Sequence, residues 1–388
     1  MSRQHKIFIL LGLLLFIGIV VPLLSPVGAA ADSLETAIAA TPTGTGPGEI
    51  DAAAPTGFLD IPGAPSPALI IAFLWAVWVG WIFSTVGAFG GIMSGVGHIT
   101  VFGLADYGKT FQKSSPLLNK VITDSIRVSN QWMVGLSALV GSVNYFRMGR
   151  LVLPLGIALA IGSVSGSYLI PVITAGKISL EAYLGYFGII VFIIGGFLFY
   201  ETTPRGQRRK KAAKEAAEAF ENAHIKKNAT VSKEESGVKV LQWSLKKIRF
   251  SFYGVEFGFR PIIPVIGGFG IAGIASFIGV GGGFLFVPFL TSIAGLPMFL
   301  VAGTSSLAVL IGMVTSLFTY MVMKGVPVFW PLIGIELVGV FVGSMIGPRT
   351  SKYIPDIWLK RLFVVLALYV GLRYTTKGFL GFSVVPPF

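Results

Sequence analysis

The apolar residues of this chain lie in blocks of roughly 20, and these blocks constrain its fold more than any other feature. A helix of that length crosses a hydrocarbon core about 30 Å thick. Lipid offers the backbone no hydrogen-bonding partners, so each block must be helical, whereas a membrane β-barrel would show alternating segments of about ten residues. Only 12% of the 388 residues are charged, about half the fraction of a soluble domain. The sequence therefore predicts an all-α fold, a polytopic bundle of transmembrane helices.

The first 66 residues predict a targeting segment followed by a tether. Two basic residues precede an apolar run over residues 7–24, and small residues follow it. This pattern fits a cleaved signal peptide and an uncleaved signal-anchor helix over residues 1–27 equally well. In both cases residues 28–66 lie outside the cytoplasm, and their Ala, Pro, Gly and Thr content predicts a disordered tether.

Ten apolar segments follow, in two sets of five on either side of a basic linker. The first set lies within residues 67–203, the linker occupies 204–260, and the second set lies within 261–388. The segments are expected at residues 68–87, 92–105, 118–143, 151–172 and 182–203, and then at 262–280, 284–297, 299–323, 328–347 and 359–380. This layout predicts two transmembrane units of similar size.

The two sets share residues at matching spacings, which indicates a duplicated unit. Residues 154–171 match 331–348 without a gap at an offset of 177, with six identities that include two prolines and two glycines. Two further matches lie upstream: Gly95-Val96-Gly97 with Gly279-Val280-Gly281 at an offset of 184, and Thr123 and Ser125 with Thr304 and Ser306 at an offset of 181. The matches follow one another in the same order in both sets, so we expect two repeated halves.

The distribution of charge predicts how the halves are oriented. Residues 201–260 hold 14 Lys and Arg against 7 Asp and Glu, whereas residues 28–66 hold five acidic residues and no basic one. This asymmetry marks the linker as cytoplasmic and speaks against a nucleic-acid footprint. A half that connects outside to inside crosses an odd number of times, so its copy is inverted, as in many secondary transporters. The inversion does not follow if the first two segments of each half form one bent crossing.

The sharpest local feature is Gly279-Val280-Gly281-Gly282-Gly283, which lies inside an apolar stretch. Glycine weakens a helix by about 1 kcal/mol per position relative to alanine, so this run predicts a broken or re-entrant helix at membrane depth. A break frees backbone N–H and C=O groups, which persist in lipid only where they line a cavity. Helix ends that meet at one spot form an ion site, and N-terminal ends favour an anion.

A second glycine cluster lies at the matching place in the first half, between residues 87 and 98. Breaks in corresponding positions of two halves are the best sequence indication of a transporter's binding site. The glycines predicted to bind the substrate through freed amides are Gly95, Gly97, Gly279, Gly281, Gly282 and Gly283. The alternative is that these glycines only allow close helix packing. A nucleotide-binding loop would need a preceding strand and a following amphipathic helix, which the sequence does not predict.

The third segment of the first half carries charges in a membrane setting. Lys120, Asp124 and Arg127 lie at i, i+4 and i+7, on one face of a helix, where they can pair. Charges in membrane segments are costly and mark sites by default. The planar guanidinium of Arg127 could donate two hydrogen bonds to an oxyanion, and Asp124 could couple transport to protons. The alternative is a structural ion pair between these two side chains.

Five polar residues elsewhere complete the candidate site. The hydroxyls of Thr304, Ser305 and Ser306 could donate to an anion, or could bond back to their own helix. His98 lies in the first glycine cluster and could contact the substrate and titrate near neutral pH, or could be a hydrogen-bonded packing residue. Glu336 is a lone carboxylate in an apolar helix, which fits either a proton carrier or a polar contact between helices.

The sequence shows no set of residues that would support catalysis. The chain has no cysteine, its three histidines lie far apart, and it carries no HExxH motif. Disulfides, thiolate metal sites and cysteine nucleophiles are therefore excluded. We predict that the protein is not an enzyme and needs neither a metal nor another cofactor.

The second half carries a series of motifs in a fixed order. They are the glycine run at 279–283, Pro288-Phe289-Leu290, Gly295-Leu296-Pro297, Ala302-Gly303-Thr304-Ser305 and the glycines from Gly339 to Gly347. Together they resemble the sulfite exporter TauE/SafE family of membrane permeases, more closely over residues 262–348 than over 68–172. The resemblance implies two repeated halves, a substrate site between them, and transport of sulfite, organosulfonates or another small anion. The first half departs from the family pattern at residues 93–98, at 107–115 and in its charged helix face.

These features predict a secondary transporter, an exporter of sulfite or a related small sulfur-containing anion, which works by alternating access in the cell inner membrane. A passive anion channel and a carrier of another small organic anion remain alternatives. Membrane lipids are expected around the bundle, and no nucleic-acid partner is expected. The charged stretch at 208–221 fits a solvated connector or contact with anionic lipid. The oligomeric state stays open.

Overall fold

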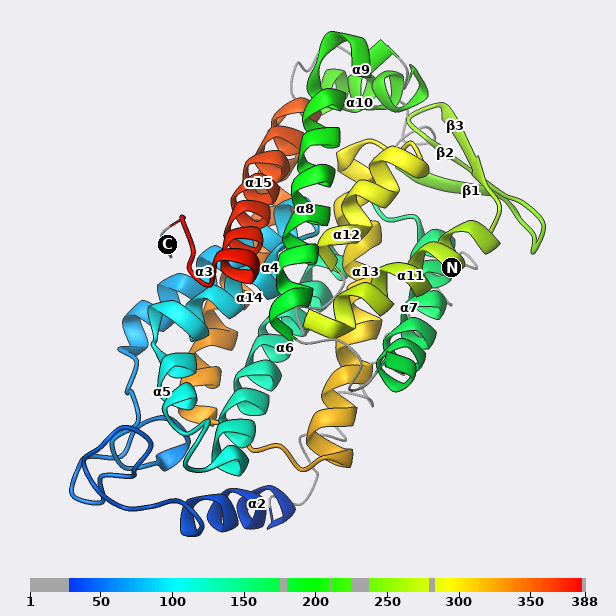
Figure 1. The fold of residues 1–388 in the computed structure, drawn as a ribbon. Coiled ribbons are helices and arrows are strands. Elements are labelled where there is room, and N and C mark those ends of the chain that lie inside the picture. The colour runs from blue at the N-terminus through cyan, green and yellow to red at the C-terminus, as the bar shows by residue number, and fades with distance from the viewer. Residues whose placement is uncertain (1–27, 175–179, 209–210, 225–236, 279–282, 386–388) are drawn as a thin grey trace.

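The computed structural model describes residues 28–174, 180–208, 211–224, 237–278 and 283–385. The helices of the first half are α3 (Leu69–Val86), α4 (Gly90–Val96), the π-helical turn η2 (Gly97–Val101), α5 (Leu104–Thr110), α6 (Pro116–Arg147), α7 (Leu153–Thr174) and α8 (Leu180–Thr202). Those of the second half are α11 (Ile262–Ile278), α12 (Gly283–Pro288), η3 (Phe289–Ile293), α13 (Met298–Leu317), η4 (Phe318–Met323), α14 (Trp330–Ser351) and α15 (Asp356–Leu380). They form one elongated helical bundle (Figure 1). This arrangement confirms the predicted mostly helical architecture.

Several helices have the length and composition of membrane spans. Within the described residues, α3, α13 with its continuation η4, and α14 are long and apolar enough to cross a bilayer. Shorter apolar helical stretches lie in α7, α8, α11 and α12–η3. Large apolar side chains are exposed on the outside of the bundle, among them Leu69, Ile70 and Leu74 of α3 and Val338, Phe341 and Ile346 of α14. Such surfaces fit contact with lipid.

The two halves interlock, because the main helix contacts run between them. α3 packs against α14, α7 against α11, α6 against α13 and α8 against α15. Glycines permit the closest of these contacts. A Cβ at Gly162 or Gly166 would overlap the backbone of α11, and one at Gly339 or Gly343 would overlap the backbone of α3. The glycines of α7 and α14, which recur at intervals of four, therefore serve close helix packing.

The helix boundaries test the alignment of the two halves. α7 and α14 begin at Leu153 and Trp330, which reproduces the offset of 177. The π-helical turns η2 and η3 begin at residues 97 and 289, and left-handed glycines follow them at Gly103 (φ 68°) and Gly295 (φ 65°). Both pairs give an offset of 192. The offset of 184 was therefore wrong, because it aligned two helical glycines, at positions 95 and 97, with the glycine run after α11.

The first predicted helix break is present, but it lies upstream of two of the glycines assigned to it. α3 ends at Val86, and Gly87 (φ 74°) and Phe89 (φ 67°) are left-handed before α4 begins. Gly95 lies inside α4, and Gly97 begins η2 and donates its N–H to the carbonyl of Met93. The prediction that the break frees the amides of Gly95 and Gly97 was wrong.

The second predicted break falls where α11 ends at Ile278 and α12 begins at Gly283. Gly279, Gly281 and Gly282, which were predicted to bind the substrate, lie outside the described residues. The second break therefore stays a prediction, and Gly283 is the first residue of α12 that the structure describes.

Residues 33–66 are folded, which corrects the expectation of a disordered tether. The helix α2 (Gly28–Ala39) packs against α6, and a short 3₁₀ turn, η1 (Phe58–Asp60), follows. Phe58 and Ile61 are fully buried, and the ring of Phe58 meets that of Phe329 edge to face at 5.6 Å. The segment buries enough apolar surface to offset the entropy lost on ordering it.

The basic linker folds at the opposite end of the bundle from α2 (Figure 1). It contains α9 (Pro204–Arg208), α10 (Lys211–His224) and an antiparallel sheet of β1 (Val238–Trp243), β2 (Ile248–Phe252) and β3 (Val255–Phe259), in the order β1-β2-β3. The charged helix was expected and the sheet was not. Alternate residues Ile248, Phe250 and Phe252 of β2 are buried, so this strand packs one face inward.

Candidate substrate and proton site

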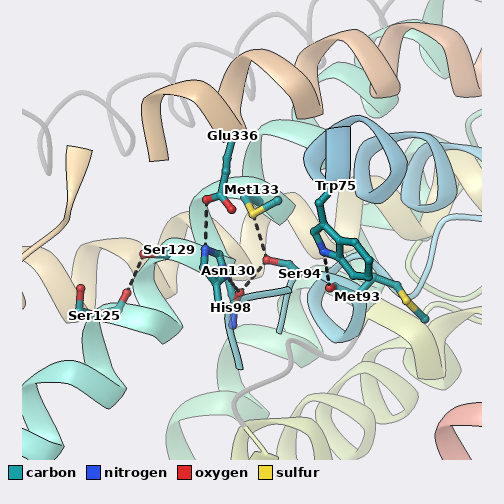
Figure 2. Close-up of polar contacts among 9 residues, drawn as sticks. All are labelled: Trp75, Met93, Ser94, His98, Ser125, Ser129, Asn130, Met133 and Glu336. Carbon is teal, nitrogen blue, oxygen red and sulfur yellow. Dashed lines mark hydrogen bonds and ion pairs between the residues drawn. The ribbon is translucent and has the colours of Figure 1, made fainter. Parts of the chain in front are cut away.

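A cluster of buried polar side chains lies where η2 meets α6 and α14 (Figure 2). His98 comes from η2, Asn130 from α6 and Glu336 from α14, so both halves contribute. His98 and Glu336 are fully buried, and Nε2 of the imidazole lies 3.1 Å from Oε2 of the carboxyl. Nδ1 of the same ring lies 2.6 Å from Oδ1 of Asn130. Two of the predicted site residues, 238 positions apart, are thus direct partners.

The π-helical turn η2 is what brings the imidazole to this place. Gly97 opens the turn, and a Cβ there would overlap the indole of Trp75 on α3. The indole donates from Nε1 to the carbonyl of Met93 at 3.0 Å, which ties α3 to α4. Single π-helical turns are frequent at functional sites, because they re-aim one side chain out of helical register.

The hydrogen bonds around Asn130 define where the protons of the imidazole lie. Ser94, one turn before His98, donates its hydroxyl to Oδ1 of Asn130 at 2.7 Å. The same amide oxygen faces Nδ1 of His98 and can only accept, so Nδ1 carries a hydrogen. The ring therefore meets Glu336 through its other nitrogen.

The contact between Nε2 of His98 and Oε2 of Glu336 needs one proton. That proton makes either an imidazolium beside a carboxylate or a neutral imidazole beside a carboxylic acid, and both forms have zero net charge. Without it, two lone pairs would face each other in a buried setting, which is strongly unfavourable. A proton on one of these two atoms therefore satisfies the contact between the halves.

Two buried side-chain oxygens, one in this pair and one farther along α6, have no hydrogen-bond partner in the part of the chain that the structure describes. They are Oε1 of Glu336 and Oγ of Ser125, which lies on α6 before Asn130 (Figure 2). A buried polar atom without a partner costs about 1–3 kcal/mol. The site thus has spare hydrogen-bonding capacity that a water molecule, a proton or a polar solute could use.

The start of α4 and the first described residues of α12 meet at one small cavity. Gly90 and Gly91 of α4 line it from the first half, and Gly283 and Phe284 of α12 line it from the second. The cavity measures about 10 Å³, which holds roughly one water molecule. The first amides of a helix have no acceptor within that helix, so the start of α4 brings N–H donors to this region. The cavity is closed to any larger solute in this conformation.

Thr304, Ser305 and Ser306 of α13 are fully buried and bond back to their own helix, which was one of the two interpretations. Two of them also fasten the second half to the first. Ser305 donates to the carbonyl of Gly87 at 3.0 Å, at the first break, and Oγ of Thr304 accepts the N–H of Val152 at 3.1 Å. Their direct contact with a substrate stays a prediction.

Asp124 and Arg127 form an ion pair of 3.0 Å within α6. The side chain of Arg127 is 34% exposed, and that of Asp124 is 11% exposed. Lys120, one turn earlier, is exposed. This geometry matches the structural ion pair that the sequence allowed, and the guanidinium reaches Asp124 through Nη1.

Sequence reasoning assigned no role to Ser94, Asn130 or Trp75. Ser94 and His98 are four residues apart on consecutive turns, and Asn130 follows Arg127 by three. Polar side chains at these spacings lie on one helix face. Uncharged polar residues at helical spacing from an ionisable one were therefore the signal that could have found them.

Comparison with known proteins agrees with this architecture. A family model described as sulfite exporter TauE/SafE matches residues 71–374. Searches of functionally described proteins and of solved structures found no match. Members of this family are membrane transporters and not enzymes, which agrees with the expectation from the sequence. The matched segment runs from the start of α3 into the last helix, and the chain belongs to the sulfite exporter TauE/SafE family.

Proposed function

We propose that this protein exports sulfite or a related small sulfur-containing anion by alternating access. The observation that carries the proposal is the buried junction between the halves. There, Gly90 at the start of α4 and Gly283 of α12 line one cavity, and the His98–Glu336 pair joins η2 of the first half to α14 of the second. Helix N-termini favour an anion, and the family membership indicates a sulfur-containing one.

The packing of the helices supports two inverted repeats that move against each other. In each half the helix of the fourth apolar segment packs against the first helix of the other half, as α7 does against α11 and α14 does against α3. Such an exchange is what a two-fold pseudo-symmetry would produce, and inverted repeats commonly provide alternating access. Residues 204–260 would then be cytoplasmic and residues 28–66 extracytoplasmic, in a chain of the cell inner membrane.

The proton-holding pair supports coupling to the proton gradient. With one shared proton the pair of His98 and Glu336 is neutral, and a second proton would make it +1. A second proton would offset the charge of one monoanion at the junction, where an uncompensated charge would be costly. Protons and anions would then bind together and move through the same conformational change.

Flux measurements in proteoliposomes test the proposal. We expect labelled sulfite to enter at a saturating rate, to show counterflow and to respond to an imposed pH gradient. A rate that rises without saturation, and without counterflow, would indicate the alternative of a passive anion channel. Transport of a small carboxylate in preference to sulfite would indicate the other alternative. No transport of any small oxyanion would overturn the proposal.

A further inference from the structure

Arg150 is a fully buried cation at the linker end of the bundle. It lies between α6 and α7 and is 2% exposed. Nε donates to the carbonyl of Phe299 at 3.1 Å, and Nη1 lies 3.3 Å from both the carbonyl of Pro348 and the hydroxyl of Ser351. Among the residues that the structure places, no carboxylate lies within ion-pair distance of it. Within the described chain, the charge is therefore buried without a carboxylate partner.

The surroundings of the guanidinium compensate this charge only in part. The rings of Tyr145, Phe220 and Phe299 lie 4.8, 5.1 and 5.4 Å from its central carbon. Each such cation–π contact offsets a fraction of the lost hydration. Nη2 is buried and has no hydrogen-bond partner within the described chain. Among the described residues, the Nη2 group of Arg150 thus keeps N–H donors that an oxyanion could accept.

The linker covers this cation. Phe220 belongs to α10, is 1% exposed, and stacks against Phe299 with ring centroids 4.2 Å apart. The next residue, Glu221, accepts the N–H of Asp356 at 2.9 Å, at the start of α15. The helix α10 is therefore fastened to the bundle at the point where it shields Arg150.

Polar groups continue from Arg150 toward the first helix break. The hydroxyl of Tyr145 lies 3.2 Å from that of Ser351 and donates to the carbonyl of Ser84 at 2.6 Å, in the last turn of α3. The neighbouring hydroxyl of Thr85 is buried without a partner in the described chain. These groups form a polar route between the linker end and the place where α3 ends.

We propose that Arg150 is a second anion-binding residue of the transport route, and that Phe220 of the linker is the cover that must lift before an anion reaches it. The ligand is a small oxyanion that accepts from Nη2 of Arg150 and from the hydroxyl of Ser351. This inference rests on the proposed anion transport. It adds a site at the linker end and gives the folded linker a role in gating.

Binding of sulfite to the purified full chain, measured by calorimetry, tests the site. We expect Phe220→Ala to tighten binding by about tenfold, because the cost of opening the cover is removed. Adding Arg150→Gln should abolish that gain, and Arg150→Lys should retain part of it. Phe250→Ala is the matched control, since Phe250 is an equally buried aromatic of the same linker that packs on Phe257. Melting temperatures would show which variants fold.

Access to the site can be followed with a single thiol, because the chain has no cysteine of its own. In vesicles whose linker faces the bath, a membrane-impermeant thiol reagent should modify Ser351→Cys slowly. Adding Phe220→Ala should raise that rate by about tenfold, whereas adding Phe250→Ala should not. These experiments are done without sulfite, which reacts with such reagents.

Three outcomes separate this inference from the proposed function. Unchanged sulfite affinity in a folded Arg150→Gln, with or without Phe220→Ala, would overturn the second site while transport stands. Equal labelling rates with and without Phe220→Ala would overturn the cover. Absence of both sulfite binding and transport in the unaltered chain would overturn the proposed function itself.

Discussion

The polar junction on one side of the bundle has an apolar counterpart on the other. The segments α4–η2 and α12–η3 match at an offset of 192, and α7 matches α14 at an offset of 177. At these offsets, His98 corresponds to Leu290 and Glu336 corresponds to Leu159. Both leucines are fully buried. The matched positions of the other half therefore carry buried apolar side chains, and we infer that the His98–Glu336 pair serves function and not the fold.

The surroundings of the pair differ between the halves in the same way. At the offset of 181, Asn130 corresponds to Ile311 and Arg127 corresponds to Ala308. At the offset of 192, Ser94 corresponds to Phe286. The polar network is thus confined to one of two architecturally similar places. The polar contacts of the junction therefore come from a few side chains, and the helices of the other half have apolar residues at the matched positions.

The largest effect is expected from converting the polar contact into its apolar counterpart. The double variant His98→Leu/Glu336→Leu should fold with a stability close to that of the unaltered chain, because well-packed apolar residues often replace a buried ion pair without loss. It should also lose the response of sulfite flux to a pH gradient. The single variant Glu336→Leu should be less stable by about 1–3 kcal/mol, because it leaves Nε2 of His98 unpaired. Thermal unfolding and proteoliposome flux measure both; a double variant less stable than the single one would contradict this account.

Close helix packing should respond alike in the two halves. Gly166→Ala on α7 and Gly343→Ala on α14 each place a methyl group against the backbone of the partner helix. Each should destabilise the protein by about 1–3 kcal/mol, the usual cost of overpacking. Gly334→Ala on α14, which meets nothing within 4 Å, is the control. A denaturation midpoint that falls in only one of the two variants would contradict the structural match between α7 and α14.

A smaller change is expected at the amide that orients the imidazole. Asn130→Ile copies the matched residue of α13 and removes the acceptor shared by His98 and Ser94. The loss of these hydrogen bonds should cost about 1–2 kcal/mol and shift the pH dependence of sulfite flux. Asn130→Asp keeps an oxygen acceptor and should retain more stability. An unchanged pH profile in Asn130→Ile would show that the amide plays no part in proton binding.

The smallest effect is expected at the ion pair on α6. Arg127→Gln breaks a contact whose cation is 34% exposed, so the change in unfolding free energy should stay within about 1 kcal/mol. Sulfite flux should change by less than about threefold, because the guanidinium pairs with Asp124. A loss of sulfite flux beyond tenfold in a stable Arg127→Gln protein would indicate that Arg127 binds the substrate.

Local patterns predicted much of the helical frame. The glycine spacings of α7 and α14 identified both the repeat offset and the packing faces, because small residues at intervals of four have a direct geometric meaning. The glycine clusters were harder, since composition does not distinguish a glycine inside a helix, such as Gly95, from one at its end, such as Gly87. The glycine cluster of the first half therefore predicted a helix break but not the residues at which it lies.

Long-range contacts were beyond the sequence patterns. The pairing of His98 with Glu336 joins residues 238 positions apart, and the sequence around either residue does not indicate the other as its partner. Arg150 is one basic residue beside an apolar segment, so only the contacts made by α10 and α13 reveal that it is buried. The folded linker sheet escaped notice because its apolar residues alternate with polar and charged ones over very short strands.

Simultaneous recording of sulfite flux and proton flux in proteoliposomes tests whether the His98–Glu336 pair couples sulfite transport to protons. In the unaltered chain, protons should move with sulfite in a fixed ratio. In His98→Leu/Glu336→Leu, shown to be folded by its melting temperature, that coupled proton movement should vanish. Proton movement that accompanies sulfite equally in both proteins would contradict a junction built around this pair.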